Sequence, residues 1–241
     1  MKTQLLIVVQ TLLKALGYYM GYIDGEEGVM TRNAVTHFKE TNGLRARDFI
    51  GPVTLALLCS PQAKPAPKPT PRKDVNGVTE PPWLGEARNL LGTREVLGGG
   101  NNPTIMKWAD DLDQWYPSDD VPWCGLFVAH CMAVGAPQEP QSFNRLGARA
   151  WRVFGEQCEP SIGAIGVFWR THKTRSVNGH VAFIIGEDDT TYHILGGNQS
   201  DNVTITRITK SRLLECRAPS GWKGGKVLRS VIGGAVSQNE T

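Results

Sequence analysis

Two short segments of this sequence carry residue types that together can perform nucleophilic chemistry. Val121-Pro-Trp-Cys124 precedes an apolar stretch typical of a buried helix, and Gly179-His180-Val-Ala-Phe183 begins a stretch typical of a strand. A cysteine thiol is a weak nucleophile at its ordinary pKa, but a helix N-terminus and a neighbouring imidazolium stabilise its thiolate. If Cys124 and His180 meet in the fold, they form the thiolate and base of a hydrolase or an acyltransferase.

The expected strand pairing predicts a third member of this set. The segment 186–190 has the composition of a turn between two strands. A turn at residues 187–189 pairs positions whose numbers sum to about 376, so that His180 faces Gly196. Asn198 then lies one diagonal step away on the same face, where it can orient the imidazole ring. A Cys-His-Asn set is a variant of the catalytic triad.

Most other titratable side chains of this region have simpler interpretations. Cys131 lies two turns along the same helix as Cys124 and is expected in the core, and a structural role is favoured for the neighbouring His130. His172 lies in a basic loop that is expected to face water. His193 alternates out of phase with Asn198 and is expected on the other face of its strand.

The region around Cys124 also contains candidate site-lining residues and an acidic run. The Cys124 backbone N–H is the expected first donor of an oxyanion hole. We expect no cofactor, but the acidic run could bind calcium, with a solvated helix face as the favoured alternative. Asp119 or Asp120 could instead cap the Cys124 helix or line the site. The site-lining candidates are Trp123, Asp120, Gln199 and Glu95, and the acidic run is Asp110, Asp111, Asp113, Asp119 and Asp120.

A proline- and lysine-rich segment divides the chain of 241 residues into parts. Residues 60–73 alternate proline with lysine and small residues, a composition that cannot form a core and predicts an extended tether. The scattered, odd number of cysteines, 5 in all, predicts no disulfide framework and no zinc site. The predicted organisation is a three-helix domain at 1–60, a linker at 61–81, an α+β domain at 82–222 and a poorly ordered tail at 223–241.

The segment before the tether has the pattern of three short helices. Apolar residues at helical spacing predict the first helix over 4–16, ended by Gly17. Thr31 is expected to cap the second helix, and Gly51-Pro52 to start the third. Asp24-Gly25 has turn chemistry between the first two.

This segment resembles the three-helix peptidoglycan-binding module of many cell-wall hydrolases. The resemblance covers nearly all of residues 4–58, with Phe38-Lys39 in place of the usual Phe-Gln. Tyr19, Tyr22, Asp24 and Arg32 are its candidate wall contacts, although a structural role is favoured for each. The resemblance rests on Val9-Gln10, Leu13, Leu16-Gly17-Tyr18, Ile23-Asp24-Gly25, Gly28, Thr31, Ala34-Val35, Phe38, Gly43-Leu44 and Gly51-Pro52-Val-Thr54.

The remainder of the chain predicts a helical layer followed by an antiparallel sheet, which is an α+β domain. Helices are expected over 83–91, 103–115 and 123–134, and strands over 162–169, 180–185 and 191–195.

Residues 82–219 resemble the papain-like wall hydrolases related to the NlpC/P60 and CHAP families. The resemblance rests on Trp123-Cys124, Gly179-His180-Val181, Leu195-Gly-Gly-Asn-Gln199, Pro82-Trp-Leu-Gly85 and Arg217-Ala-Pro219. It implies that Cys124 is the nucleophile, His180 the base and then acid, and Asn198 the residue that orients the ring. CHAP relatives often place Glu two residues before that Asn. Gly196 stands there, so Asn198 or Gln199 must serve.

Together the two resemblances imply a modular, phage-type endolysin that is made in the host cytoplasm without a signal peptide and acts on the wall after release. The implied substrate is peptidoglycan of the Gram-negative, diaminopimelate type. An endopeptidase cut within the stem peptide is favoured over an N-acetylmuramoyl-L-alanine amidase. An inactive wall-binding protein and an acyltransferase remain alternatives. We expect a monomer.

The composition argues against two other classes of partner. The net charge is +3, and its excess lies mainly in the linker, which predicts no nucleic-acid groove. No apolar run approaches the roughly 20 residues of a membrane span, so stable membrane insertion is not expected.

Overall fold

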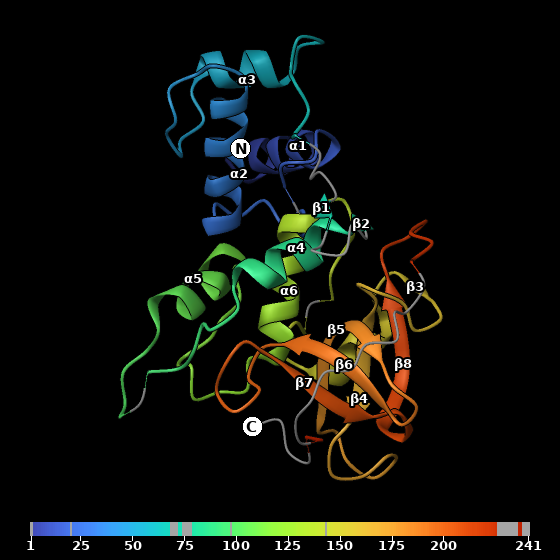
Figure 1. The fold of residues 1–241 in the computed structure, drawn as a ribbon. Helices are drawn as coiled ribbons and strands as arrows, with labels where there is room; N and C mark the ends of the chain where they lie inside the picture. Colours follow the sequence, from blue (N-terminus) through green and yellow to red (C-terminus); the bar gives the residue numbers. More distant parts are fainter. Residues whose placement is uncertain are drawn as a thin grey trace. The chain divides into compact units, whose positions relative to one another are not determined.

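The computed structural model describes residues 2–19, 21–67, 72–73, 79–96, 98–142, 144–225 and 236–237. The chain divides into two compact units (Figure 1). One comprises Met1–Pro69 with Ala109–Trp115, and the other comprises Thr70–Trp108 with Tyr116–Thr241.

The N-terminal part contains three helices, as the apolar spacing predicts. These are α1 (Lys2–Ala15), α2 (Val29–Thr41) and α3 (Pro52–Leu58). Gly17 follows α1 with a φ of 84°, a conformation that favours glycine and ends the helix. The three helices share one apolar core, whose buried members are Val9, Leu13, Tyr18, Tyr19, Met30, Ala34, Val35, Phe38 and Leu58.

The start of the second helix differs from the prediction. α2 begins at Val29, and its N-cap is Gly28, with no side-chain cap. Thr31 is buried inside the helix, where its hydroxyl donates to the Glu26 carbonyl and accepts from Gln10 Nε2. The predicted cap was wrong because this hydroxyl fastens the preceding loop to α1 rather than satisfying the helix end.

The linker prediction requires a partial correction as well. Ala63 and Ala66 pack against the N-terminal core, and the Ala66 N–H donates to the Leu16 carbonyl at 2.8 Å. The beginning of the proline-rich segment is therefore part of the N-terminal packing. Further along, β1 (Arg72–Lys73) pairs antiparallel with β2 (Thr79–Glu80). The rest of the predicted linker, 68–71 and 74–78, and most of the predicted tail, 226–235 and 238–241, lie outside the described residues.

The larger unit contains an antiparallel sheet of 6 strands in the order β3-β8-β4-β5-β6-β7. All its named strand pairs are antiparallel, which confirms the α+β class. The strands are β3 (Glu156–Gln157), β4 (Ile165–Trp169), β5 (Gly179–Glu187), β6 (Thr191–Gly196), β7 (Thr204–Thr209) and β8 (Leu213–Ala218).

Helix α6 (Cys124–Gly135) lies between α4 (Pro82–Asn89) and β5 in this unit (Figure 1). Its sequence is apolar on all sides because nearly every residue is buried. A side chain at Gly135 would place its Cβ 2.1 Å from the Trp83 nitrogen, so the close approach of α4 requires glycine there. The remaining helices are α5 (Pro103–Asp111) and two 3₁₀ helices, η1 (Ala148–Val153) and η2 (Lys210–Arg212).

The pairing of β5 with β6 is shifted by two residues from the predicted register. The structure pairs Phe183 with Leu195, so that positions sum to 378 rather than about 376. The turn begins at Asp188, whose Oδ1 accepts the N–H groups of Thr190 and Thr191. A bulge between Ile184 and Gly186 shifts the register once more near the turn.

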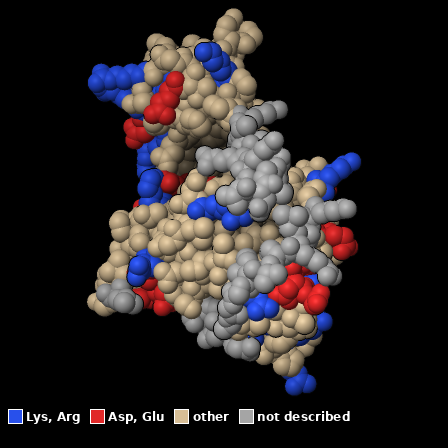
Figure 2. All heavy atoms as spheres, in the orientation of Figure 1, with Lys and Arg blue, Asp and Glu red and all other residues tan. Residues whose placement is uncertain are grey.

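No helix among the described residues is both long enough and apolar enough to span a bilayer. On the face shown in Figure 2, basic and acidic side chains are interspersed rather than gathered by sign.

Candidate active site

Cys124 is the first residue of α6, and Trp123 immediately before it fixes the start of that helix. The Trp123 ring is fully buried, and its Nε1 donates to Glu95 Oε1 at 2.6 Å. The loop after β6 packs directly on this ring, since a Cβ at Gly197 would lie 2.5 Å from it. Trp123 therefore holds the helix start and the loop after β6 together.

The thiol of Cys124 is buried, and its polar neighbours offset part of the effect of this burial on its pKa. Burial raises its pKa, while the backbone N–H groups of Val181 and Gly125 and the charge of Arg170 act in the opposite direction. Val181 directly follows His180 on β5. The contact of its N–H with Sγ therefore sets the thiol beside the start of the strand that carries His180.

The His180 ring is buried and bonded to Gln199. His180 is 1 % exposed, and its Nε2 lies 3.1 Å from Gln199 Oε1. The same oxygen accepts from the Thr206 hydroxyl at 3.1 Å.

The hydrogen bonds of Gln199 determine which nitrogen of His180 carries the proton. Gln199 Nε2 donates to the carbonyl groups of Gly196 and Thr204, at 3.2 and 2.6 Å. These two acceptors identify Nε2 as the amide nitrogen, so Oε1 is the acceptor that faces His180. His180 Nε2 must therefore be the N–H donor, which leaves Nδ1 as the basic nitrogen of the neutral ring.

Gln199, which was predicted as the alternative to Asn198, makes the described bond to the imidazole. Asn198 is buried at 4 % exposure, but it has a φ of 54° and lies beyond the end of β6 at Gly196. The alternation of faces along a strand does not extend to it. The described residues show no hydrogen bond between Asn198 and His180. The longer glutamine side chain reaches back to the ring from the following position.

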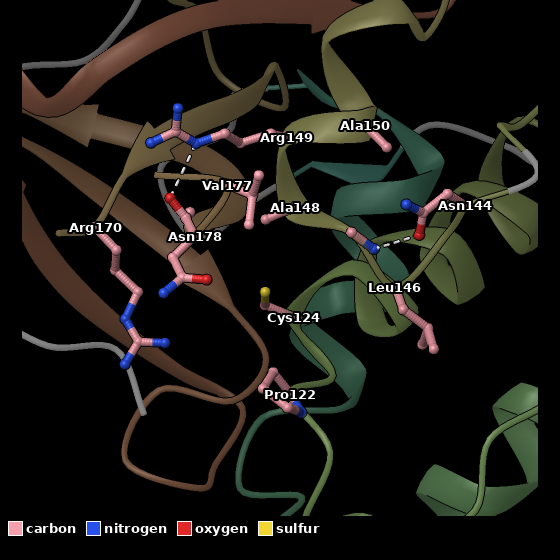
Figure 3. Close-up of a pocket in the computed structure, with 12 residues that line it drawn as sticks. Pro122, Cys124, Asn144, Leu146, Ala148, Arg149, Ala150, Arg170, Val177 and Asn178 are labelled. Atoms are coloured by element: carbon pink, nitrogen blue, oxygen red, sulfur yellow. Dashed lines mark hydrogen bonds between the residues drawn. The ribbon is translucent and has the colours of Figure 1, made fainter. Parts of the chain in front are cut away.

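A cleft of about 380 Å³ opens beside the thiol. Figure 3 shows Cys124 Sγ directed into the space between Asn178 and Ala148. One wall is the segment 144–150, which includes the start of η1, and the facing wall is formed by Arg170 and the segment 177–179. Pro122 and Cys124 complete the lining.

Arg149 joins the two walls of the cleft. Its guanidinium donates to three backbone carbonyls of the opposite loop, those of His172, Lys173 and Asn178, at 2.7, 3.0 and 2.9 Å. The Asn178 bond is drawn in Figure 3. These bonds hold the loop of residues 172–178 against η1.

The predicted site-lining carboxylates lie outside the described lining of this cleft. Glu95 contacts the Trp123 indole, and Asp120 is exposed beside Ser118. Neither Asp119 nor Asp120 caps α6, which has no side-chain cap. Asp119 is fully buried, contrary to a solvated face; its Oδ2 accepts the Asn102 N–H at 2.7 Å, and its Oδ1 has no partner.

Asp110 and Asp120 are exposed, as a solvated face predicts. Asp113 Oδ2 instead accepts the Met30 N–H at the start of α2 at 3.1 Å, and Asp111 Oδ1 accepts from Asn33 Nδ2 at 3.0 Å. Within the described ranges, no three His, Cys, Asp or Glu side chains are grouped as they would be to hold a metal ion.

The remaining histidines and Cys131 have the structural surroundings expected of them. Cys131 is fully buried, and His130 stacks on Trp108 and bonds to Glu86 at 3.2 Å. His172 is exposed in its loop. His193 is buried and bonded to Asp188 near the β5–β6 turn.

The four candidate wall contacts differ in their exposure and in their hydrogen bonds within the N-terminal module. Tyr19 is 3 % exposed and its hydroxyl donates to the Tyr22 carbonyl, while Asp24 Oδ1 accepts from Gln10 Nε2 at 2.8 Å. Both therefore support the loop. Tyr22 is 53 % exposed, and Arg32 is partly exposed. Asp24 is exposed as well, so Tyr22, Arg32 and Asp24 are the members of the set that a ligand could reach.

The chain thus joins a small helical module to an α+β unit in which a helix-start cysteine lies beside the start of the strand that carries His180, a histidine held by an amide. Residues 3–58 match the family model described as "Putative peptidoglycan binding domain". This match supports a peptidoglycan-binding module at the N-terminus, peptidoglycan as a binding partner and association with the cell wall. Comparison with curated proteins and with solved structures gives no match.

Proposed function

We propose that this protein is a peptidoglycan hydrolase that cleaves an amide bond of the stem peptide through the thiolate of Cys124. One observation carries the proposal. The helix-start thiol faces a cleft and lies beside the strand start where Gln199 fixes the tautomer of His180. The family match of residues 3–58 adds the wall polymer as the substrate class.

The chemistry follows from the tautomer. His180 Nδ1 takes the proton from Cys124 Sγ, and the thiolate attacks the amide carbonyl carbon. The Cys124 N–H is a donor for the resulting oxyanion. The imidazolium then protonates the leaving amine, the C–N bond breaks and a thioester remains. Water, deprotonated by His180, attacks this thioester and releases the carboxylic acid and the free thiol.

The charge of the cleft suits a stem peptide. Arg170 lines the cleft and supplies positive potential near Cys124 Sγ. Stem peptides of the diaminopimelate type carry free carboxylates, which a guanidinium can pair with. We therefore favour an endopeptidase cut within the stem over cleavage of the muramoyl–alanine amide.

The N-terminal module raises the effective concentration of the wall polymer at the cleft. A wall-binding module joined to a hydrolase by a short segment keeps the cleft near its polymer after each cut. This arrangement supports the role of a phage-type endolysin, which reaches a Gram-negative wall from the host cytoplasm after release.

The decisive experiment digests purified Gram-negative sacculi with the wild type and with Cys124→Ser, followed by mass spectrometry of the released fragments. We expect fragments from the wild type only, with a new amine inside the stem. Cys59→Ser is the matched control, because Cys59 is exposed and lies outside the larger unit. Thermal unfolding of each variant shows that it is folded.

Each alternative gives a distinct result. A new amine on L-alanine identifies the amidase, and fragments joined to an added amine identify an acyltransferase. Sacculi that bind the wild type without release of fragments identify a wall-binding protein without this activity. Equal digestion by Cys124→Ser refutes the thiolate mechanism.

A further inference from the structure

Two cysteines outside the candidate active site lie opposite each other on neighbouring strands. β3 pairs with β8 as Glu156 with Ala218 and Gln157 with Arg217. The next pair in this register is Cys158 with Cys216, and the Cys158 N–H donates to the Cys216 carbonyl at 3.2 Å. Directly opposed residues of an antiparallel pair have Cα atoms about 4.5–5.5 Å apart. That separation lies within the range of about 4.4–6.8 Å that a disulfide spans.

The two side chains lie on the same side of the sheet. Cys216 is 3 % exposed within the core cluster that includes Phe168 and Ile184, and Cys158 packs against that same cluster. Opposed residues of an antiparallel pair project to one face, so the register and the packing agree. The two cysteines are therefore neighbours on one face of the sheet.

Cys158 is also accessible to a small reagent. It is partly exposed and lines a hollow of about 460 Å³ that residues 159–161 and 222–225 complete. Cys216 is buried behind it. One thiol of the pair can therefore meet a soluble disulfide, while the other can reach only its neighbour.

We propose that Cys158 and Cys216 are a modification site at which a low-molecular-weight disulfide, such as oxidised glutathione, forms an intramolecular cross-link between β3 and β8. The Cys158 thiolate attacks one sulfur of oxidised glutathione, which breaks the S–S bond and releases one glutathione. The Cys216 thiolate then attacks the Cys158 sulfur of the mixed disulfide and releases the second glutathione. The two protein thiols are oxidised, one glutathione disulfide is reduced, and the two thiol protons leave on the two glutathiones.

The redox state of the compartment determines whether Cys158 and Cys216 are present as thiols or as a disulfide. A reducing cytosol keeps such a pair as thiols, whereas an oxidising compartment outside it permits the cross-link. Burial raises the pKa of the Cys158 thiol, so the first exchange is faster at alkaline pH. Cys124 lines a different cleft and does not take part.

The test uses the full chain incubated with oxidised glutathione at about pH 8.5, quenched with acid and alkylated. Trypsin places the two cysteines in different peptides, 153–170 and 213–217. We expect mass spectrometry to show these peptides joined, two hydrogen masses lighter than their sum, and reduction to separate them. Cys59→Ser must leave the joined peptide unchanged. Cys216→Ala should instead accumulate the Cys158–glutathione mixed disulfide.

A second measurement is independent of peptide mapping. Cross-linking of strands far apart in sequence should raise the Tm of the wild type by roughly 5 °C, and Cys216→Ala should show no such rise. The proposal is overturned if wild-type Cys158 stays alkylatable, ends as a stable mixed disulfide or pairs with another cysteine.

Discussion

Replacing Gln199 with leucine tests the central geometric claim, because Gln199 Oε1 is the acceptor that faces His180 Nε2 at 3.1 Å. Leucine fills a similar volume and offers no acceptor. In the proposed mechanism the His180 ring becomes an imidazolium, so its bond to Gln199 Oε1 changes from a neutral to a charge-assisted bond. Net contributions to stability are about 0.5–1.5 kcal/mol for neutral bonds and about 1.5–3 kcal/mol for bonds to charged groups.

The difference between these two values, about 1–1.5 kcal/mol, is the stabilisation that the variant loses in the transition state. It corresponds to a fall in kcat/KM of roughly 5- to 13-fold. A less stable imidazolium also means a less stable thiolate–imidazolium pair. The pH dependence of Cys124 alkylation should therefore move up by about one pH unit.

The assay compares kcat/KM on a soluble stem-peptide fragment and the rate of iodoacetamide labelling of Cys124 across pH. Thr206→Val is the matched control, because it removes a bond to the same Gln199 oxygen without touching His180. It should lower the free energy of unfolding by about 1 kcal/mol and leave kcat/KM within about twofold. If Gln199→Leu is folded, cleaves as well as this control and keeps its labelling profile, Gln199 has no role beyond structure.

Three further predictions address other parts of the larger unit. Arg170→Ala should shift the labelling profile of Cys124 to higher pH, because the guanidinium charge opposes the rise in its pKa; Lys173→Ala serves as the control, and equal profiles would contradict this reasoning. Gly125→Ala should lower the free energy of unfolding in urea by at least about 2 kcal/mol, since its Cβ would lie 2.2 Å from the Arg145 carbonyl oxygen; an unchanged midpoint would show that α6 can move. Hydrogen bonds, first that from Thr191, lower the pKa of Asp188. The contribution of the Asp188 carboxylate to the free energy of unfolding is therefore complete above the unfolded pKa of about 3.9 and is lost as the pH falls toward the folded pKa. Denaturant titrations should show that the stability of Asp188→Asn falls less steeply with acid than that of the wild type. An equal dependence of stability on pH in the two proteins would contradict this prediction.

The larger elements could be predicted from the sequence because each has a strong local pattern. The apolar run after Cys124 is long enough to exclude a strand, and the β-branched segment after His180 is too short and too regular to be a helix. The register in which this strand pairs with its neighbour could not be predicted in the same way. Its register depends on where the Asp188 turn begins and on one bulged residue, and the alternation of apolar residues reports neither.

The exchange of Asn198 for Gln199 has a specific physical origin. Strand periodicity assigns faces only while the chain remains extended, and the chain leaves β6 at Gly196. The paired glycines before Asn198 are the feature of the sequence that marks this departure. Past that point the reach of a side chain decides its partners. Asp119 was misassigned for a related reason: Asp120 beside it is exposed, but backbone N–H groups from another loop enclose the Asp119 carboxylate.

The three carbonyl bonds of Arg149 have a consequence for how a substrate arrives. A loop that folded over the cleft would first have to break these bonds, so residues 172–178 act as a fixed rim rather than a closing lid. A rigid, open trough does not require the free end of a chain to thread through it. In the proposed function, such a trough would bind one strand of the insoluble peptidoglycan from the side, so that the substrate stays in place and the protein changes position.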